Sequence, residues 1–390
     1  MRENIAATPF TVAVPDAVLD DLRDRLSRTR FPAEEPGTPW QYGTSLAWLR
    51  MVVERWRTGY DWRTWERKLN RFPHYRAPVA GLASGPLDVH FILERGSGEN
   101  PLPLLLTHGW PGSVVEFLDV IEPLAHPERF GGDVRDAFTV VVPSLPGYGF
   151  SAAPPQPIRA SDVPAIWTHL MVDVLGCDGF VAQGGDWGGI VTSWLGLAHT
   201  KNLRAIHLNG APFRAAVDPA NPVTAEEAAW QEADRKKRDG LAGYQMIQGT
   251  QPQTLAYGLT DSPAGLAAWI LEKFHAWTVR HSAHPPPFDL DHLLTNVMLY
   301  WLNGINAPSW LYLSLFDPTL TSPPPGRKVQ VPTGFMLCPN DLGVPPPDSW
   351  LRRSYNMVHR NDAQKGGHFL AFEQPRLFVN ELRDFFRAYR

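Results

Sequence analysis

Apolar side chains near the start of the chain recur at helical spacing. Residues 19–26 and 46–56 place Leu, Val and Trp every three or four positions, which predicts two amphipathic helices. Asp16 is in position to cap the first helix, and Pro32 marks its end. The segment up to about residue 80 offers no obvious catalytic group, so we expect it to supply packing surface.

From residue 87 onward, short apolar runs alternate with helical segments. The runs predict strands at residues 87–93, 102–107, 138–142, 179–182, 203–208 and 331–338. Most of these runs are apolar throughout, which is typical of strands buried on both faces. The alternation therefore predicts a mostly parallel central sheet with helices on both of its faces.

This alternation stops near residue 212 and returns near residue 331. The intervening stretch carries helical patterns, a charged segment at Glu232–Asp239 and several proline breaks, which favour an inserted helical lid. We expect four parts in chain order. They are an N-terminal extension packing on core and lid (1–95), a first core part (96–212), the lid (213–324) and a second core part (325–390).

Composition narrows the class of protein. The chain has 390 residues, of which 44% are hydrophobic, so it is long enough for a large core. A net charge of −4 with no basic run argues against nucleic acid or an anionic membrane as partner. We find no signal region and no membrane-spanning run, and expect a soluble, cytoplasmic protein without a membrane anchor. Cys177 and Cys338 lie beside apolar runs and are predicted to be buried free thiols. The oligomeric state, including a homodimer, stays open.

The most informative stretch is Gly184–Gly189, with the sequence Gly-Gly-Asp-Trp-Gly-Gly. It joins a predicted strand directly to a predicted helix, the arrangement of a nucleophile elbow, in which small neighbours let the backbone approach closely. Asp186 stands where an esterase has Ser. A carboxylate attacks carbon without first losing a proton, so Asp186 is the predicted nucleophile. The alternative is a glycine-rich turn whose Asp merely caps the next helix.

Two further polar groups follow predicted strands, as sites on open α/β sheets do. Asp341 comes after the run at 331–338, and His368 follows Gly366–Gly367. The chain order Asp186, Asp341, His368 is the order of an α/β-hydrolase triad of nucleophile, acid and base. Asp341 as a turn residue, Asp348 as its rival and His368 as an ordinary loop histidine are the alternatives.

His108–Pro111 follows the run at 102–107, where this fold places half of its oxyanion hole. We predict that the backbone N–H groups of Trp110 and Trp187 are the donors. The alternative is a turn that the proline only stiffens. Directly after this turn, Ser113 and Glu116 have the spacing of a capping box.

These motifs together resemble the epoxide hydrolases of the α/β-hydrolase superfamily. The similarity is to the branch with microsomal and juvenile-hormone epoxide hydrolases and their soluble bacterial and fungal relatives, and it extends over nearly the whole chain. The segments that carry it are His108–Ser113, Gly184–Gly189, Gly366–Phe369 with Glu373–Pro375, Arg25–Pro32, Tyr60–Arg63 and Leu69–Pro73. The membrane-bound members have an N-terminal hydrophobic anchor, and this sequence shows none.

The resemblance implies two lid tyrosines that donate hydrogen bonds to the epoxide oxygen. Tyr244 is the first choice and Tyr312 the second, with Tyr257 and Tyr300 as rivals. A phenol is suited to this role because its ordinary pKa of about 10 keeps it protonated at neutral pH. Many membrane-bound members have Glu where this chain has Asp341. The residues predicted to contact substrate are Trp110, Trp187, Phe150 and Phe369.

The predicted reaction converts a small, apolar epoxide to a vicinal diol through an ester on Asp186, with no cofactor and no metal. A haloalkane dehalogenase with the same nucleophile and an inactive binding protein on the same scaffold are the alternatives. A serine esterase and a dinucleotide-binding fold are disfavoured because the sequence has neither G-x-S-x-G nor G-x-G-x-x-G at a helix start. The pair His281 and His284 has faint metal spacing, and we interpret it as part of a solvated loop.

Overall fold

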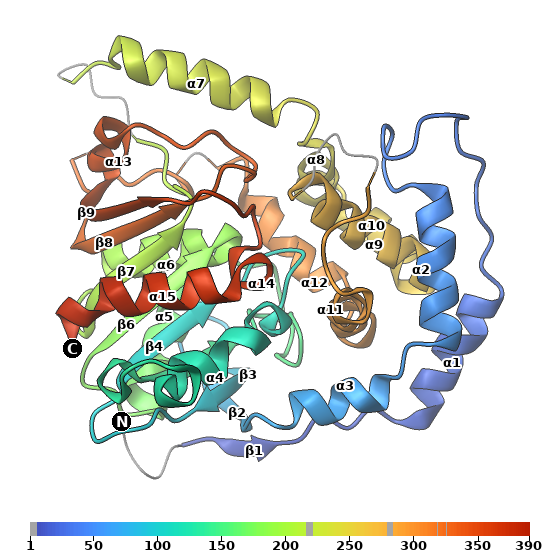
Figure 1. The fold of residues 1–390 in the computed structure, drawn as a ribbon, viewed down its shortest axis with the longest axis horizontal. Coiled ribbons are helices and arrows are strands. Elements are labelled where there is room, and N and C mark those ends of the chain that lie inside the picture. The colour runs from blue at the N-terminus through green and yellow to red at the C-terminus, as the bar shows by residue number, and fades with distance from the viewer. Residues whose placement is uncertain (1–5, 216–220, 279–283, 318, 325) are drawn as a thin grey trace.

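The chain folds around one mixed β-sheet that runs through the molecule (Figure 1). The structure is a computed structural model and describes residues 6–215, 221–278, 284–317, 319–324 and 326–390. Within these residues nine strands form the sheet, in the order β1-β2-β3-β5-β4-β6-β7-β8-β9. The strands are β1 (Thr8–Phe10), β2 (His74–Val79), β3 (Leu87–Glu94), β4 (Leu102–Thr107), β5 (Phe138–Pro143), β6 (Phe180–Gly185), β7 (Leu203–Asn209), β8 (Val329–Leu337) and β9 (Tyr355–Asp362).

Strand direction divides the sheet into two parts. β1, β2, β3 and β5 pair antiparallel in that order, whereas every neighbouring pair from β5 through β9 is parallel. The central strands β4, β5 and β6 are buried along almost their whole length. The prediction of a mostly parallel sheet with apolar strands is therefore confirmed.

Helices cover both faces of the sheet (Figure 1). On one face, α4 packs against α15, whose Phe378, Leu382 and Phe385 are buried. On the other face, α5 packs against α6, the helix that begins directly after β6. The bounds are α4 (Leu118–Ala125), α5 (Val163–His169), α6 (Asp186–Ala198), α13 (Asp348–Ser354), α14 (Leu370–Glu373) and α15 (Pro375–Phe386), with shorter helical turns at η1 (Val114–Phe117), η2 (Pro127–Phe130), η3 (Val134–Asp136), η4 (Leu170–Val174) and η6 (Arg387–Tyr389).

The N-terminal extension supplies strands as well as helices. The two predicted helices are present as α1 (Asp16–Ser27) and α2 (Leu46–Thr58), and α3 (Trp62–Leu69) follows them. α1 and α2 contact the lid helix α10, and β1 and β2 extend the central sheet. The prediction that Asp16 caps α1 is wrong, because Pro15 holds the cap position and Asp16 is the first helical residue.

The described part of the segment between β7 and β8 consists mostly of helices, as predicted for a lid. Its helices are α7 (Ala225–Arg238), α8 (Gly243–Thr250), α9 (Pro252–Asp261), α10 (Pro263–Ala276), α11 (Leu290–Asn303), α12 (Asn306–Ser309) and η5 (Trp310–Ser314). α7 lies apart from the others, over α13 (Figure 1). Its Glu227 pairs with Arg353 of α13 at 2.7 Å, and its Trp230 donates to the carbonyl of Val344. The charged helix α7 is thus fastened to the second core part. The division into four parts remains a prediction.

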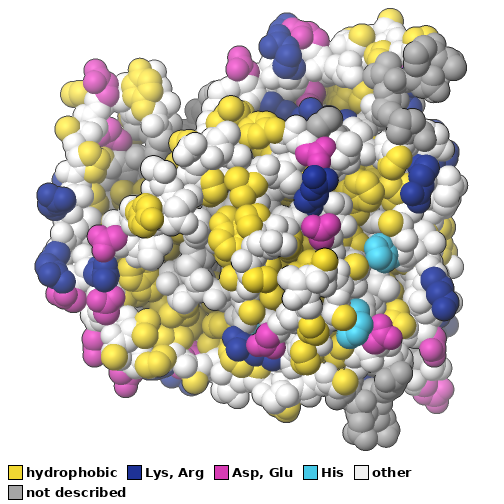
Figure 2. Space-filling model, turned by 180° about the vertical axis from the view of Figure 1, so that it is seen from behind, with side chains coloured by type: hydrophobic (Ala, Val, Ile, Leu, Met, Phe, Trp, Pro, Cys, Tyr) yellow, Lys and Arg dark blue, Asp and Glu magenta, His cyan; other side chains and the backbone are white. Residues whose placement is uncertain are grey.

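The surface carries both signs of charge. On the face seen in Figure 2, acidic and basic side chains are interspersed with apolar ones, and the residues described there form no large patch of one sign. Across the described part of the chain, no helix combines the length and the apolar character that crossing a membrane requires. Cys177 and Cys338 are buried free thiols, as predicted.

Candidate active site

Asp186 stands at the sharp turn between β6 and α6. Its φ of 51° lies in the left-handed region, which a short polar side chain tolerates better than most others do. The carboxylate passes so close to Gly109 that a Cβ there would lie 2.3 Å from Asp186 Oδ1. The glycine of the His108–Pro111 loop therefore makes room for the carboxylate, and the turn holds Asp186 as a nucleophile elbow does.

The other two members of the predicted triad meet Asp186 at the carboxyl ends of the parallel strands. His368 Nδ1 lies 2.7 Å from Asp341 Oδ1, and His368 Nε2 lies 3.4 Å from Asp186 Oδ2. The N–H of Leu342 donates to the same Asp341 oxygen at 2.6 Å. Asp348, the rival acid, lies on α13 and pairs with Arg360 at 2.9 Å, so it has a separate partner.

Charge in this cluster sets the protonation of the imidazole. Burial alone would lower the pKa of His368, but Asp341 and Asp186 outweigh burial and raise it to about 10. Burial likewise opposes ionisation of Asp341, and the neighbouring His368 nevertheless holds its pKa below the usual value. His368 is therefore an imidazolium at neutral pH, as long as Asp186 carries its negative charge.

The loop after β4 brings a backbone donor to the nucleophile. The N–H of Trp110 donates to Asp186 Oδ1 at 2.8 Å. The His108 side chain anchors this loop to the chain that follows β5, because its Nε2 accepts the N–H of Leu145 at 3.1 Å. Trp187 is the second residue of α6, where backbone N–H groups have no partner within the helix. The geometry thus matches half of an oxyanion hole, and the donor role of Trp187 remains a prediction.

Aromatic rings from the lid cover the nucleophile on the side of Trp110. Tyr244, on α8, stacks on the Trp110 ring with centroids 5.0 Å apart and planes 10° apart. Tyr312, on η5, meets the Trp110 ring edge-on at 5.7 Å and the Trp187 ring at 4.9 Å. The two phenol rings lie 5.7 Å from each other. We call these four residues the aromatic wall.

Both phenols of the aromatic wall are protonated donors at neutral pH. Burial and the charge of Asp186 raise the pKa of Tyr244, and burial raises that of Tyr312 strongly. Of the two rivals, Tyr257 is 70% exposed on α9. Tyr300 is buried, but its hydroxyl already donates to the carbonyl of Gly112 at 2.7 Å. Tyr244 and Tyr312 are therefore the two of these four candidates whose rings pack on Trp110, the residue whose N–H binds Asp186.

The remaining predicted substrate contacts separate into two groups. Phe369 is buried beside His368 and stacks on Phe274 of α10 at 4.1 Å. Phe150 packs instead against Phe10 of β1 and His90 of β3, at 5.4 Å and 5.2 Å. The structure does not bring Phe150 together with Asp186, because this ring closes the junction between the N-terminal strands and the core.

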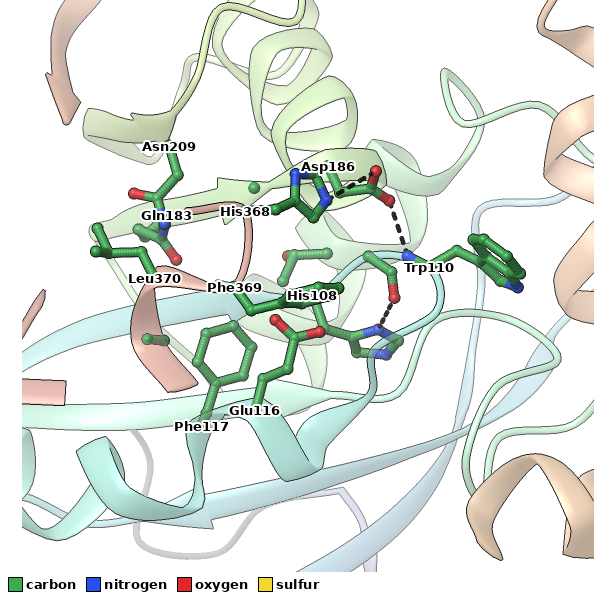
Figure 3. A pocket seen from close by; sticks show the side chains of 14 residues that line it. His108, Trp110, Glu116, Phe117, Gln183, Asp186, Asn209, His368, Phe369 and Leu370 are labelled. Carbon is green, nitrogen blue, oxygen red and sulfur yellow. Dashed lines mark hydrogen bonds and ion pairs between the residues drawn. The ribbon is translucent and has the colours of Figure 1, made fainter. Parts of the chain in front are cut away.

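A small cavity of about 20 Å³ opens beside Asp186, on the side away from the Trp110 ring (Figure 3). It is lined by Thr107, His108, Gly109, Trp110, Glu116, Phe117, Gln183, Gly185, Asp186, Asn209, His368, Phe369, Leu370 and Ala371. Gln183 and Asn209 come from the ends of β6 and β7 and were not predicted. A single Gln in an otherwise apolar strand, two residues before the glycine that precedes Asp186, is the sequence signal that could have found the first of them.

Glu116 was predicted only as half of a capping box. Ser113 does cap η1 and its backbone is hydrogen-bonded to the Glu116 carboxyl, but the prediction missed that this carboxyl also lines the cavity. The Ser113 hydroxyl accepts the N–H of Val115 and donates to Asn296. The Glu116 carboxyl points inward to the cavity, into space that a Cβ on Gly112 would occupy. Burial raises its pKa to about 8, so it carries a proton near neutral pH.

A second unpredicted carboxyl supports the loop that carries His368. Glu373 Oε1 accepts the N–H groups of Gly367 and Phe369, the residues on either side of His368. Burial raises the pKa of Glu373 to about 7. Glu373 thus holds the backbone on both sides of His368 in place.

The predicted absence of a metal is not tested by the structure. His281, one member of the faint metal-spacing pair, lies outside the described residues. Among the residues that are described, no group of three or more His, Cys, Asp and Glu side chains has an arrangement that could hold a metal ion.

Comparison with known proteins gives matches over the whole chain. A family model described as "Epoxide hydrolase N terminus" matches residues 7–117, and one described as "alpha/beta hydrolase fold" matches residues 103–253. A putative epoxide hydrolase of Stigmatella aurantiaca is 42% identical over 386 residues, covering 98% of this chain and 85% of the relative.

Solved structures agree with this result. Juvenile hormone epoxide hydrolase from the silkworm Bombyx mori superposes with a TM-score of 0.85 at 30% identity, covering 99% of this chain and 95% of that one. The epoxide hydrolase of Aspergillus niger gives 0.84 at 31% identity, covering 99% and 97%. The α/β-hydrolase fold class is thereby confirmed. These relatives do not favour a dehalogenase or a binding protein.

Proposed function

This chain belongs to the epoxide hydrolase family, and we propose that it hydrolyses an apolar epoxide to a vicinal diol through a covalent ester on Asp186. The observation that supports this route most directly is the placement of one carboxylate. Asp186 Oδ1 accepts the Trp110 N–H, while Oδ2 faces His368. One oxygen is thus held by an oxyanion donor, and the other is free to attack carbon.

In the first step, Asp186 Oδ2 attacks an epoxide carbon and the carbon–oxygen bond of the ring breaks. Tyr244 and Tyr312 donate hydrogen bonds to the departing oxygen, and one of them transfers a proton to it. The aromatic wall is buried, so it excludes water from this side while the ester forms. A buried wall of Trp and Tyr rings also suits an apolar substrate.

Formation of the ester changes the imidazole. Asp186 loses its negative charge, and one of the two carboxylates that raise the pKa of His368 disappears. The pKa of His368 then falls, so the imidazolium gives up its proton, and this proton neutralises the phenolate that the first step leaves on Tyr244 or Tyr312. The first step thereby prepares His368 as a base for the second, with Asp341 keeping the ring in place.

In the second step, His368 Nε2 takes a proton from water, and the hydroxide adds to the ester carbonyl carbon of Asp186. The negative charge on Oδ1 is stabilised by the N–H of Trp110 and, in our proposal, by that of Trp187. The bond to the diol oxygen then breaks and the imidazolium gives its proton to that oxygen. The new carboxyl group of Asp186 passes its proton to His368, which restores the Asp186 carboxylate and the imidazolium.

The test uses a panel of aryl and alkyl epoxides and measures diol formation, with haloalkanes assayed for halide release. The fastest epoxide is then turned over once in ¹⁸O water by excess enzyme. We expect an unlabelled diol and one ¹⁸O atom in the Asp186 peptide, measured by mass spectrometry. A diol labelled from solvent in that first turnover would contradict the covalent route.

A further inference from the structure

We propose that the cavity beside Asp186 binds the water molecule that hydrolyses the ester, and that Thr107, Gln183 and Asn209 position this water. The inference rests on the proposed function, since it concerns the second step of that reaction. It assigns a ligand and three positioning residues to a part of the site that neither lid tyrosine borders.

The volume of the cavity fits one water molecule. A buried water needs roughly 10–15 Å³ of accessible cavity, and this cavity provides about 20 Å³. The same volume is far too small for an epoxide carrying an aryl or alkyl group. Of the aromatic wall only Trp110 borders the cavity, and in Figure 3 its ring points away from Gln183 and Asn209. Substrate and water therefore reach Asp186 from different sides.

The lining of the cavity offers several polar atoms that need a partner. Thr107 Oγ1, Gln183 Oε1 and Asn209 Oδ1 are buried and have no hydrogen-bond partner within the described part of the chain. Buried polar atoms are rarely left unpaired, and ordered water is their usual partner when no protein group is present. A buried water makes two to four hydrogen bonds: here it can donate one proton to His368 Nε2 and the other to an amide oxygen of Gln183 or Asn209, and it can accept from the Thr107 hydroxyl.

These three side chains stand on rigid elements at one edge of the sheet. Thr107 ends β4, Gln183 lies near the end of β6, and Asn209 ends β7. The strand register places Gln183 and Asn209 on one face of the sheet, since Asn209 is paired with Gly185, two residues after Gln183, and Thr107 borders the same cavity from the last position of β4. A site built on adjacent strand ends holds a bound molecule more precisely than a site on mobile loops would.

The base and the electrophile border the same cavity. His368 and Asp186 both line it, and His368 Nε2 meets Asp186 Oδ2 only at 3.4 Å, outside hydrogen-bond geometry. A water held here gives its proton to His368 Nε2 and its oxygen to the Asp186 carbonyl carbon. That bond forms as the carbonyl electrons move onto Oδ1, and the diol oxygen leaves in the next step, as described above.

Thr107→Val is the sharpest variant, because it removes the hydroxyl and keeps the shape of the side chain. Since that hydroxyl has no protein partner, the melting temperature should not fall. We expect the rate of ester formation to be unchanged and the rate of ester hydrolysis to fall about five- to tenfold, the effect of one lost hydrogen bond. kcat and KM should then fall together, and the ester should accumulate in the steady state.

The matched control is Thr333→Val on β8. Thr333 is equally buried, but its hydroxyl donates to the carbonyl of Val331, away from the cavity. We expect its ester hydrolysis to proceed at the wild-type rate. Gln183→Met is the second variant and should slow ester hydrolysis in the same way. The two rates are measured by rapid quench and mass spectrometry of the intact protein, with the fastest epoxide of the panel.

The outcomes separate the two proposals. Wild-type ester hydrolysis in both Thr107→Val and Gln183→Met, or an equal loss of both rates, would overturn the water site and leave the covalent mechanism in place. No detectable ester in the wild-type protein would overturn the proposed function, and the water site with it. A crystal structure gives an independent measurement. It should show one water within hydrogen-bond distance of Thr107 Oγ1 and His368 Nε2, and a dry cavity would contradict the proposal.

Discussion

The carboxylate of Asp186 lies between two regions whose side chains differ in kind. On the lid side lie four aromatic rings, packed at centroid distances of 4.9 to 5.7 Å, with neutral phenols among them. On the sheet side lies a cavity bordered by amide, hydroxyl and imidazole groups, three of whose oxygens have no partner in the described chain. The same side chain thus faces packed aromatic rings in one direction and, in the other, a cavity of mixed lining that contains unpaired polar atoms.

The difference teaches how one carboxylate can serve two steps with conflicting needs. Ring opening benefits from the absence of water, because hydrogen bonds from the phenols are stronger in a nonpolar surrounding. Ester hydrolysis needs a water molecule beside a base. If each region serves one step, then substitutions in each region should affect different rates, and only changes at their junction should affect both.

Replacement of the shared residue should have the largest effect. Asp186→Asn removes the nucleophile but keeps a short polar side chain that tolerates a positive φ, so the fold should remain. We expect diol formation to fall on the order of 10⁶-fold, as for the loss of other enzymatic nucleophiles. Product analysis measures this loss. Turnover within tenfold of wild type would show that a different group attacks the epoxide.

His368→Gln should have a smaller effect, which is confined to the hydrolysis of the ester. The first step should still take place, because the Asp186 carboxylate needs no base. Ester hydrolysis should slow by about 10²–10⁴-fold, the usual contribution of a general base. The intact protein should therefore gain the mass of one epoxide and keep it for many minutes. Loss of ester formation as well would mean that His368 also serves the first region.

The aromatic wall provides the opposite test. Tyr244→Phe and Tyr312→Phe each remove one phenol and should slow ester formation by up to about 10²–10³-fold, with the larger loss in the double variant. The rate at which a preformed ester hydrolyses should change little. Single-turnover kinetics distinguishes the two rates. As a control, Tyr257→Phe alters a largely exposed tyrosine on α9 and should leave both rates unchanged.

The smallest expected effect is a change of pKa at the junction. The negative charge of Asp186 helps to raise the pKa of His368 to about 10. In Asp186→Asn that charge is gone, so the imidazolium is less stable and the pKa of His368 should move down from 10 towards its ordinary value. An NMR titration of the histidine ring measures the shift. An unchanged or higher pKa would contradict the mechanism by which ester formation prepares the base.

The sequence predicts the three residues of the triad well, because their positions follow from the geometry of a parallel sheet. Apolar strands are visible as runs, and polar residues directly after them must meet at one edge of a parallel sheet. Asp186, Asp341 and His368 follow this rule. The ring nitrogens of His368 lie 2.7 Å from Asp341 Oδ1 and 3.4 Å from Asp186 Oδ2. The lid tyrosines follow no such rule. They came from the resemblance to a family, because helices of an inserted segment can point in many directions.

Other elements could not be predicted because their sequences lack a pattern. β9 is an edge strand that is partly exposed and rich in polar residues, so no apolar run marks it. β2 contains Pro78, which a strand tolerates here because β1 pairs only with residues 74–76. Glu116 looked like a surface cap, since its inward direction depends on the space above Gly112. Phe150 was misplaced because nothing in its local sequence shows that β1 lies against it.

The pairing of β1 and β2 with β3 has a consequence for engineering. The first 80 residues are not a cassette that can be exchanged between relatives, because their strands share backbone hydrogen bonds with the core sheet. A chimera joined between β2 and β3 would have to reproduce the register of a foreign β1–β2 hairpin against β3, and Phe150 would lose Phe10, the ring that it packs against here. Recombination is better placed at the ends of α7, whose attachment to the rest of the fold depends on a few side chains.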